Sequence, residues 1–218
     1  MFNFSEKMTS LQSRILVAAI GFPTVVFLII QNNLLLLSLL AVATLVAVKE
    51  YIQMRPENIT WFIWGWGVLY IISGMGSFYF LRQIDENGSA FALLLFVGVS
   101  INDTFSYFIG KAFGRNKLAK NISPNKTYEG LFGGLLGSII IVDFFDVMIF
   151  DIALREKILL ILVLNIVGLF GDLLESYLKR TAKVKDSSSL LLGHGGMLDR
   201  IDSLLLTSLV TFFYVLIR

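Results

Sequence analysis

The amino-acid sequence predicts an all-α integral membrane protein, a polytopic bundle of about seven transmembrane helices. Three observations support this prediction: 56% of the 218 residues are hydrophobic, only 16% are charged, and the mean hydropathy is +0.77. An ordinary soluble domain has about 25% charged residues. A globule of this size could not hide so much apolar surface from water. We therefore expect lipid to surround residues 1–218 as a single polytopic membrane domain.

Seven windows are long and apolar enough to approach the thickness of a hydrocarbon core, which takes about 20 helical residues. They lie near residues 15–31, 34–48, 60–81, 90–110, 130–150, 158–178 and 201–217. The first is too long for a signal-peptide core and lacks a small-residue cleavage site, so we expect a permanent helix. The second is short, and only Asn32 and Asn33 separate it from the first, which leaves a re-entrant hairpin open. Trp61, Trp64 and Trp66 begin the third, where an interfacial aromatic belt is expected.

The lysines and arginines orient these helices. With the N-terminus in the cytosol, 14 of the 18 fall in cytosolic segments, and the outer segments hold only Arg82, Arg155, Lys157 and Arg218. This distribution follows the positive-inside rule. It places two basic loops, 111–129 and 179–200, on one face. We therefore expect a multi-pass protein of the cell inner membrane whose active site faces the cytoplasm.

The composition excludes several kinds of chemistry. Cysteine is absent, so the chain has no disulfide, no thiolate nucleophile and no cysteine-bound zinc. His194 is the single histidine, which excludes a metal centre with several histidine ligands. The net charge of +2 is small, and we expect no nucleic-acid partner.

Carboxylates gather where the predicted helices meet the cytosolic face. An ionisable residue in a membrane helix costs about 2.5–3.5 kcal/mol on insertion scales, so each one requires an explanation. The residues concerned lie in the fourth, sixth and seventh windows and in the last basic loop: Asp103, Asp172, Glu175, Asp186, Asp199 and Asp202. Mg²⁺ binds carboxylate oxygens, while Lys and Arg bind phosphate oxygens. Acids and bases at a single membrane depth therefore indicate a site for magnesium and phosphate.

Helical spacing refines this site. Steps of three and four residues place Asp172, Glu175, Ser176 and Lys179 on one stripe of the sixth helix. Asp199 and Asp202 are three apart and share a face of the seventh. The intervening loop contains serines at 187–189 and glycines at 193, 195 and 196. Such residues let backbone N–H groups approach a phosphate chain closely.

Other interpretations of these residues remain open at this point. Asp199 and Asp202 could simply complement the N-terminus of a helix. The basic run 111–126 could be only a topology signal or a patch for anionic lipid. Asp172 and Lys179 could belong to a structural ion network, and His194 could be an ordinary loop residue.

Two stretches of the sequence resemble the phosphatidate cytidylyltransferase family. The longer runs from Ser176 to Ser203 and contains Lys179-Arg180, Lys185-Asp186, Gly193-His194-Gly195-Gly196 and Asp199-Arg200-Ile201-Asp202. The shorter, Ser123-Pro124-Asn125-Lys126-Thr127-Tyr128-Glu129-Gly130, is similar to a second segment of that family. Asn102-Asp103 and 106–110 also agree. The resemblance covers the C-terminal half, so we expect a catalytic half at approximately 98–218.

The chain departs from the family pattern at several positions. Ser188 and Ser189 stand where the family usually has Gly-Asn, and Leu192 stands where it usually has Pro. Asn125 and Tyr128 replace Lys and Trp. These changes affect the path of the loop and leave the carboxylates and the main cations intact.

The resemblance implies transfer of the cytidylyl group of CTP to phosphatidic acid, which gives CDP-diacylglycerol and pyrophosphate in phospholipid biosynthesis. It implies Mg²⁺, or another divalent cation, on four aspartates: Asp172, Asp186, Asp199 and Asp202. Catalytic cations for the triphosphate or the lipid phosphate would be Lys179, Arg180, Lys185 and Arg200, with His194 as a positioning residue in the glycine turn. Substrate binding would fall to Ser123, Lys126, Thr127, Ser176, Gly195 and Gly196. The partners would be CTP, phosphatidic acid and membrane lipid, and a homodimer is left open.

A membrane transporter or lipid flippase with a cytosolic charged site is the strongest alternative from another class. Transport paths hold charges near the midplane, with broken helices in paired halves. Here the acids cluster at one face and no paired halves are evident. A transferase that uses CDP-linked lipids would carry an Asp-Gly-x-x-Ala-Arg start, which this sequence lacks.

Overall fold

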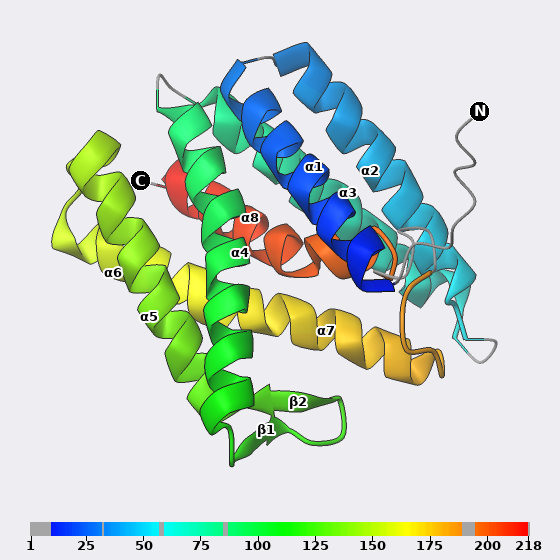
Figure 1. The fold of residues 1–218 in the computed structure, drawn as a ribbon. Coiled ribbons are helices and arrows are strands. Elements are labelled where there is room, and N and C mark those ends of the chain that lie inside the picture. Colours follow the sequence, from blue (N-terminus) through cyan, green and yellow to red (C-terminus); the bar gives the residue numbers. More distant parts are fainter. Residues whose placement is uncertain (1–9, 32, 57–58, 85–86, 189–194, 218) are drawn as a thin grey trace, which may run out of the picture.

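The computed structural model describes residues 10–31, 33–56, 59–84, 87–188 and 195–217, which form a helical bundle with one small hairpin (Figure 1). The elements are α1 (Ser10–Gln31), α2 (Asn33–Gln53), α3 (Trp61–Gln83), α4 (Gly88–Phe113), β1 (Lys117–Ala119), β2 (Ser123–Thr127), α5 (Tyr128–Phe145), η1 (Asp146–Phe150), α6 (Leu154–Leu162), η2 (Val163–Val167), α7 (Gly168–Thr181) and α8 (Leu198–Ile217). The π-helical turn η1 extends α5, and η2 joins α6 to α7 as one continuous helix. The described helices therefore form seven rods that match the seven predicted windows.

Five of these rods are long and apolar enough to cross a membrane: Asn33–Gln53, Gly88–Phe113, Tyr128–Phe150, Leu154–Thr181 and Leu198–Ile217. Within the described residues α1 adds a shorter apolar stretch, Ala19–Gln31. Large apolar side chains lie on the outside of the bundle, such as Leu34, Phe62 and Val147, each at least 74% exposed. Such a surface is stable only in lipid. The prediction of an all-α, polytopic membrane protein is confirmed.

Glycines allow α4 and α5 to pack closely along their length, side by side in Figure 1. A Cβ atom built on Gly133 would lie 2.7 Å from Cβ of Ile109, and one on Gly137 would lie 3.1 Å from Cβ of Phe105. Helices in lipid associate through close van der Waals contact between small residues rather than through exclusion of water. The glycine stripe of α5 therefore holds this pair of helices together.

A buried polar cluster links α4, α5 and η2. The Nδ2 group of Asn102 donates to Ser138 Oγ at 2.9 Å and to Asn165 Oδ1 at 3.1 Å. All three side chains are at most 5% exposed. Asn165 lies in the π-helical turn η2, and such turns often occur at functional sites because they redirect a side chain. The cluster fixes the position of α4 relative to the turn from which α7 continues, and Asn102 and Asn165 also line a cavity at the candidate site.

The sequence did not predict the β1–β2 hairpin, which lies in the first basic loop. Its antiparallel strands place Lys117 opposite Thr127 and Ala119 opposite Ser123, with an irregularity between the two pairs. Short charged strands give no alternating apolar pattern, so nothing in the sequence distinguished them from a loop. The hairpin projects from one end of α4 and α5 (Figure 1).

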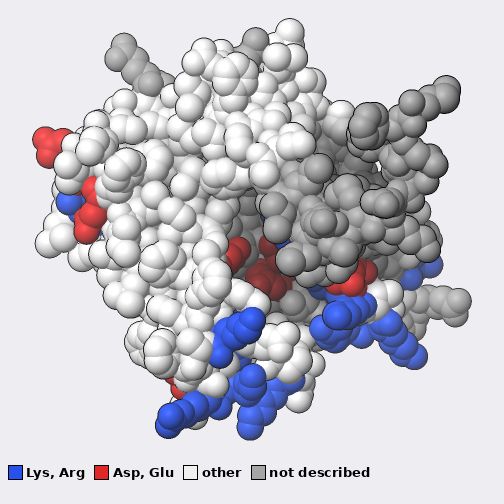
Figure 2. Space-filling model, viewed as in Figure 1, with Lys and Arg blue, Asp and Glu red and all other residues white. Residues whose placement is uncertain are grey.

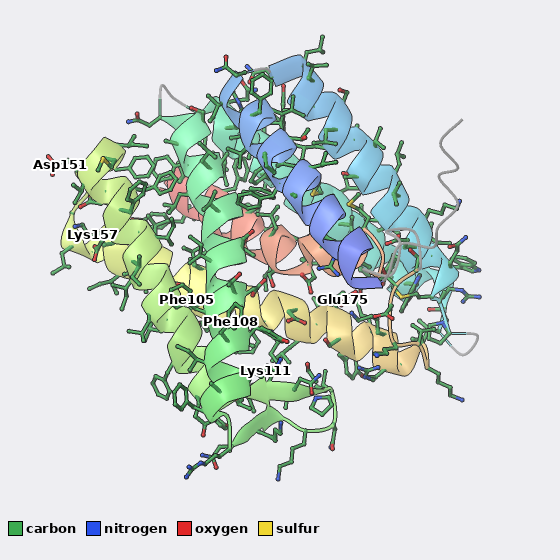
Figure 3. The ribbon with its side chains drawn as sticks, in the orientation of Figure 1. Phe105, Phe108, Lys111, Asp151, Lys157 and Glu175 are labelled. Atoms are coloured by element: carbon green, nitrogen blue, oxygen red, sulfur yellow. The ribbon has the colours of Figure 1, made fainter. Side chains whose placement is uncertain are left out.

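A separate ion pair lies at the opposite end of α5. Lys157 contacts the carboxylate of Asp146, and its Nζ lies 3.8 Å from Asp143 Oδ1. Figure 3 shows Lys157 and Asp151 at one end of the bundle, remote from Lys111 and from Glu175. These charges therefore belong to a different end of the protein from the acids of the candidate site.

Candidate active site

A hollow opens beside the basic edge of the protein. Figure 2 shows Lys and Arg gathered along this edge, next to a recess with acidic atoms inside it. A cavity of about 280 Å³ lies here between α4, the hairpin, the start of α5 and α7. Its polar lining includes Asp103, Ser123, Lys126, Thr127 and Asp172. The predicted substrate-binding residues of β2 therefore line one cavity together with two carboxylates, and we call it the polar cavity after these side chains.

Local hydrogen bonds hold β2 in place. Thr127 caps α5, since its Oγ1 accepts a hydrogen bond from Gly130 N at 3.0 Å. Glu129 accepts from the backbone N–H of Asn116 at 3.2 Å and from its Nδ2 at 2.9 Å. These bonds fix the end of β2, and the ammonium of Lys126 then forms an ion pair with Asp172 on α7.

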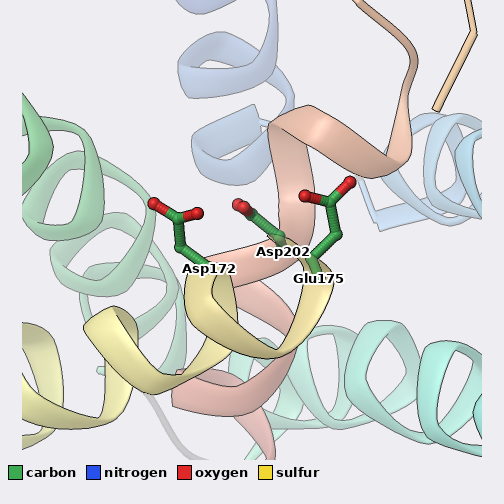
Figure 4. Close-up of side chains that lie close together, drawn as sticks. All are labelled: Asp172, Glu175 and Asp202. Atoms are coloured by element: carbon green, nitrogen blue, oxygen red, sulfur yellow. The ribbon is translucent and has the colours of Figure 1, made fainter. Parts of the chain in front are cut away.

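Three carboxylates from two helices meet beside this cavity. Figure 4 shows Asp172 and Glu175 on α7 with Asp202 on α8, and one oxygen from each lies within 4.8 Å of the others. Gly171 permits the close crossing of the two helices, because a Cβ atom there would lie 2.7 Å from the carbonyl oxygen of Asp202. The acid cluster, as we call Asp172, Glu175 and Asp202, thus sits where α7 and α8 cross.

The acid cluster fits a divalent cation. In octahedral Mg²⁺ coordination, ligand oxygens lie about 3 to 4 Å apart, so small side-chain rotations would bring all three onto one ion. Both carboxylate oxygens of Glu175 are buried; among the described residues Oε1 has no hydrogen-bond donor, and Oε2 has only the ammonium of Lys179. A buried carboxylate with so few donors is costly unless a cation compensates it.

Asp199 has a different environment from the acid cluster. Its Oδ1 lies 2.6 Å from Lys179 Nζ, and its Oδ2 accepts from Ser187 N at 3.0 Å, Ser187 Oγ at 2.9 Å and Gly196 N at 2.7 Å. Gly195 has φ of +80°, and a Cβ atom there would collide with the Asp199 carboxylate, so glycine is required. Asp199 therefore binds the loop before α8 and the cation of α7.

The other predicted site residues lie around these groups. Ser176 is buried, and its Oγ donates to Asp172 Oδ1 at 3.2 Å. Arg180 donates to the carbonyl oxygens of Ile122 and Val184, both at 3.2 Å, and so ties the hairpin to the end of α7. Exposed side chains at the same end belong to Lys185, Asp186 and Arg200. The structure does not bring Asp186 into the acid cluster, and His194 lies outside the described residues.

A second cavity of about 340 Å³ approaches the acid cluster from the side of α2 and α3. It is mostly apolar, with a lining that includes Tyr51, Trp66, Tyr70, Ile71, Leu174, Leu178 and Leu205. Glu175 and Asp202 also line it. The hydroxyl of Tyr70 is buried and has no hydrogen-bond partner among the described residues. An apolar cavity thus ends at two carboxylates and one unpaired hydroxyl.

Two acidic residues at this site have a place that sequence reasoning did not assign. The sequence grouped Asp103 with the other carboxylates of the cytosolic face but gave it no role; in the structure it lines the polar cavity from α4. Glu50 on α2 is 3% exposed and hydrogen-bonds the segments on both sides of residues 189–194. The one available signal for Glu50 was a carboxylate just beyond the apolar window 34–48.

Comparison with known proteins identifies the family. The sequence profile of the Cytidylyltransferase family matches residues 58–218, about three quarters of the chain. The chain belongs to the cytidylyltransferase family. The resemblance predicted from residues 123–130 and 176–203 is thereby confirmed. The profile begins after α2, so Glu50 lies outside the matched residues of this cytidylyltransferase-family chain.

Curated relatives agree with the family assignment. The phosphatidate cytidylyltransferase of Bacillus subtilis (strain 168) is 39% identical over 150 residues, which cover 67% of this chain and 55% of the relative. That of Staphylococcus epidermidis (strain ATCC 12228) is 45% identical over 132 residues, covering 60% and 50%. A chloroplastic phosphatidate cytidylyltransferase of Arabidopsis thaliana is 45% identical over 124 residues, covering 56% and 31%. This cytidylyltransferase-family chain spans about half the length of its bacterial relatives.

Proposed function

We propose that the chain transfers the cytidylyl group of CTP to phosphatidic acid, with CDP-diacylglycerol and pyrophosphate as products. One observation supports this most directly: a polar cavity beside a basic edge and an apolar cavity reach the same acid cluster. A soluble nucleotide and a membrane lipid require such different surroundings. The names of the relatives, phosphatidate cytidylyltransferase, agree with this reaction.

The polar cavity suits the triphosphate of CTP. Lys126 offers an ammonium on its wall, while Ser123 offers a hydroxyl group. In phosphoryl-type transfer the protein contributes mainly positioning and neutralisation of charge. On binding of CTP, Lys126 would give up part of its contact with Asp172 and bind the nucleotide phosphates instead. The phosphates would then lie next to the acid cluster.

The apolar cavity suits the lipid. The glycerol backbone and the first acyl carbons of phosphatidic acid would lie against Tyr70, Ile71 and their apolar neighbours, with the phosphate toward Asp202. The unpaired hydroxyl of Tyr70 would donate to an oxygen of the lipid head group. This places a lipid phosphate oxygen beside the nucleotide without removing the acyl chains from the membrane.

The reaction itself exchanges one bond for another. A lipid phosphate oxygen attacks the α-phosphorus of CTP, the new oxygen–phosphorus bond forms, and the bond to the β-phosphate oxygen breaks with release of pyrophosphate. A phosphate monoester is largely dianionic at neutral pH, with a second pKa of about 6, so the attack needs no general base. Asp172, Glu175 and Asp202 would hold Mg²⁺, which supplies Lewis-acid neutralisation of the phosphate charge when bound. Lys179, held by Glu175 and Asp199, adds a fixed positive charge beside them.

We also propose that this end of the multi-pass protein faces the cytoplasm, in the inner membrane of a bacterial cell. The basic segments 111–126 and 179–185 lie beside the polar cavity, as the positive-inside rule requires of a cytosolic face. CTP is soluble in the cytosol, whereas phosphatidic acid stays in the bilayer. A site at the cytosolic interface is the place where both substrates meet.

The test uses the purified chain in detergent with phosphatidic acid, Mg²⁺ and CTP labelled with ³²P at the α position. Label is expected in the organic phase only when both lipid and metal are present. With CTP labelled at the γ position, the label should stay in the aqueous phase as pyrophosphate, and diacylglycerol should not replace phosphatidic acid. Folded protein that gives no organic label with several lipids and metals would refute the proposal and favour transport instead.

A further inference from the structure

Glu50 is a buried carboxylate at the end of a helix that is otherwise buried through apolar and aromatic side chains. The buried positions of α2 are Leu36, Leu40, Ala43, Ala47, Glu50 and Tyr51. An apolar side chain would pack α2 against the bundle equally well and would avoid burying a charge. The carboxylate therefore serves its polar partners rather than the packing of α2.

Four hydrogen bonds connect Glu50 to two segments distant in the sequence. Oε2 accepts from Ser187 Oγ at 3.1 Å and from Leu198 N at 2.9 Å. Oε1 accepts from Ser188 Oγ at 2.6 Å and from Met197 N at 3.0 Å. A single carboxylate thus holds residues before and after the stretch 189–194, which lies outside the described residues.

The same carboxylate caps α8 from outside. The first N–H groups of a helix lack partners within it, and their partial positive charge favours an anion. Such caps usually come from a side chain just before the helix. Here the cap of Leu198 N comes from a residue 148 positions earlier in the chain. Its contribution therefore depends on α2 being docked against α8.

A continuous chain of contacts runs from Glu50 to the acid cluster. Ser187 Oγ lies 3.1 Å from Glu50 and 2.9 Å from Asp199 Oδ2. Asp199 Oδ1 in turn lies 2.6 Å from Lys179 Nζ, and Lys179 contacts Glu175. A Cβ atom on Gly196 would collide with both Ser187 Oγ and the Glu50 carboxylate, so glycine is required where the chain passes between them.

We propose that Glu50 is a positioning residue, which fixes both ends of the segment 187–198 and through it the orientation of Asp199 and Lys179. The inference rests on the proposed cytidylyl transfer only for its kinetic consequence. The rival interpretation is that Glu50 occupies an anion site at the start of α8 and keeps substrate phosphate out. The two interpretations predict opposite effects when the carboxylate is removed.

The kinetic test compares Glu50→Gln with wild type and with Lys49→Gln, which changes the exposed neighbour on α2. The amide nitrogen presents N–H groups to donors that need an acceptor, and each oxygen of Glu50 accepts from both sides of the segment, so the variant loses one hydrogen bond at each end. We expect kcat to fall by about tenfold to a hundredfold, the cost of misplacing a catalytic group by about 1 Å. KM for CTP should change little, and Lys49→Gln should match wild type. Glu50→Asp keeps the charge but is one methylene shorter, so it should recover part of the loss.

A double variant of Glu50 and Ser187 tests the proposal more sharply than the single variant. Because Glu50 acts through Ser187, the losses in Glu50→Gln and Ser187→Ala should not add in the double variant. Additive losses, a normal kcat in Glu50→Gln, or lower stability with full activity of the folded fraction would each overturn the proposal. A higher kcat or a lower KM for CTP would overturn it in favour of the blocked anion site.

Limited trypsin digestion tests the anchor without any enzyme assay. Lys183 and Lys185 are exposed just before the segment, so loss of the anchor should accelerate cleavage there severalfold in Glu50→Gln and not in Lys49→Gln. Unchanged cleavage would overturn the proposal even if wild type showed no transferase activity. If cleavage is faster in Glu50→Gln but wild type shows no transferase activity, the role of Glu50 as an anchor of the segment stands. Only the proposed reaction is then refuted. If Glu50→Gln does not fold, Glu50→Asp undergoes the same digestion with the same criteria.

Discussion

Asp202→Asn separates the two roles that the structure gives to neighbouring aspartates. Asp202 Oδ1 accepts from Ser203 N at 2.7 Å, and an asparagine oxygen can keep that bond. The substitution therefore removes charge from the acid cluster with little change in shape. Asp199→Asn is the matched comparison, because it makes the same chemical change three residues away, at the loop instead of the cluster.

The distances set the expected magnitudes. Two like charges 4.8 Å apart repel by about 3.5 kcal/mol at an effective dielectric constant of about 20. Loss of Asp202 removes its repulsion with both Asp172 and Glu175, so metal-free Asp202→Asn should be at least as stable as wild type. Mg²⁺ at about 100 times its dissociation constant should stabilise wild type by about 2.7 kcal/mol. The variant should gain far less, so the order of stabilities should reverse when Mg²⁺ is added.

The assay is unfolding of the purified protein by titration with SDS, followed through the fluorescence of the tryptophans on α3, with EDTA or with Mg²⁺. Asp199→Asn should be less stable in both conditions, because Lys179 and the loop lose their acceptor, yet it should still respond to Mg²⁺. Equal stabilisation of Asp202→Asn and wild type by Mg²⁺ would refute the metal assignment. So would a Mg²⁺ response lost only in Asp199→Asn.

Three further substitutions test the walls of the site. Lys126→Met should raise KM for CTP by about tenfold through loss of one charge-assisted phosphate contact, whereas Lys120→Met, exposed on the hairpin, should match wild type in the same steady-state assay. Tyr70→Phe should raise KM for phosphatidic acid and leave KM for CTP unchanged; equal effects on both would show that the hydroxyl does not contact the lipid. Gly196→Ala should destabilise the protein by about 1–3 kcal/mol in SDS titration, since its Cβ collides with a hydroxyl and a carboxylate; wild-type stability would contradict this packing.

The fold could be predicted because a bilayer requires a pattern that can be seen directly along the sequence. Each spanning segment needs a continuous apolar stretch, and every backbone polar group in it must be satisfied within the helix. The window assigned to the second helix ended at residue 48, but α2 continues to Gln53. The charged pair Lys49 and Glu50 indicated the end of the membrane-spanning segment. In the structure, the Glu50 carboxylate accepts hydrogen bonds from partners 137 to 148 residues away. Contacts of that range leave no local pattern.

The candidate site was predictable where helical geometry applies. The three-residue step from Asp172 to Glu175 predicted their shared face, and both belong to the acid cluster. The same rule grouped Asp199 with Asp202, but at the first turn of α8 Asp199 turns to the loop and to Lys179, whereas Asp202 joins the acid cluster. The rule does not apply at all to Asp186, which lies in an exposed bend. Magnesium at Asp186 or Asp199, and the roles of the remaining predicted residues, stay predictions.

The arrangement of the two cavities bears on the geometry of the reaction. Displacement at phosphorus needs the attacking and leaving oxygens on roughly opposite sides of the atom. The polar cavity reaches the cluster from α4, α5 and β2, through Asp172, whereas the apolar cavity reaches it from α2 and α3, through Glu175 and Asp202. In the proposed reaction, CTP and the lipid would reach the acid cluster from different helices, with the pyrophosphate group and the lipid phosphate apart. The crossing of α7 and α8 at Gly171 brings the carboxylates together, and in the proposed reaction it would also set the direction from which each substrate arrives.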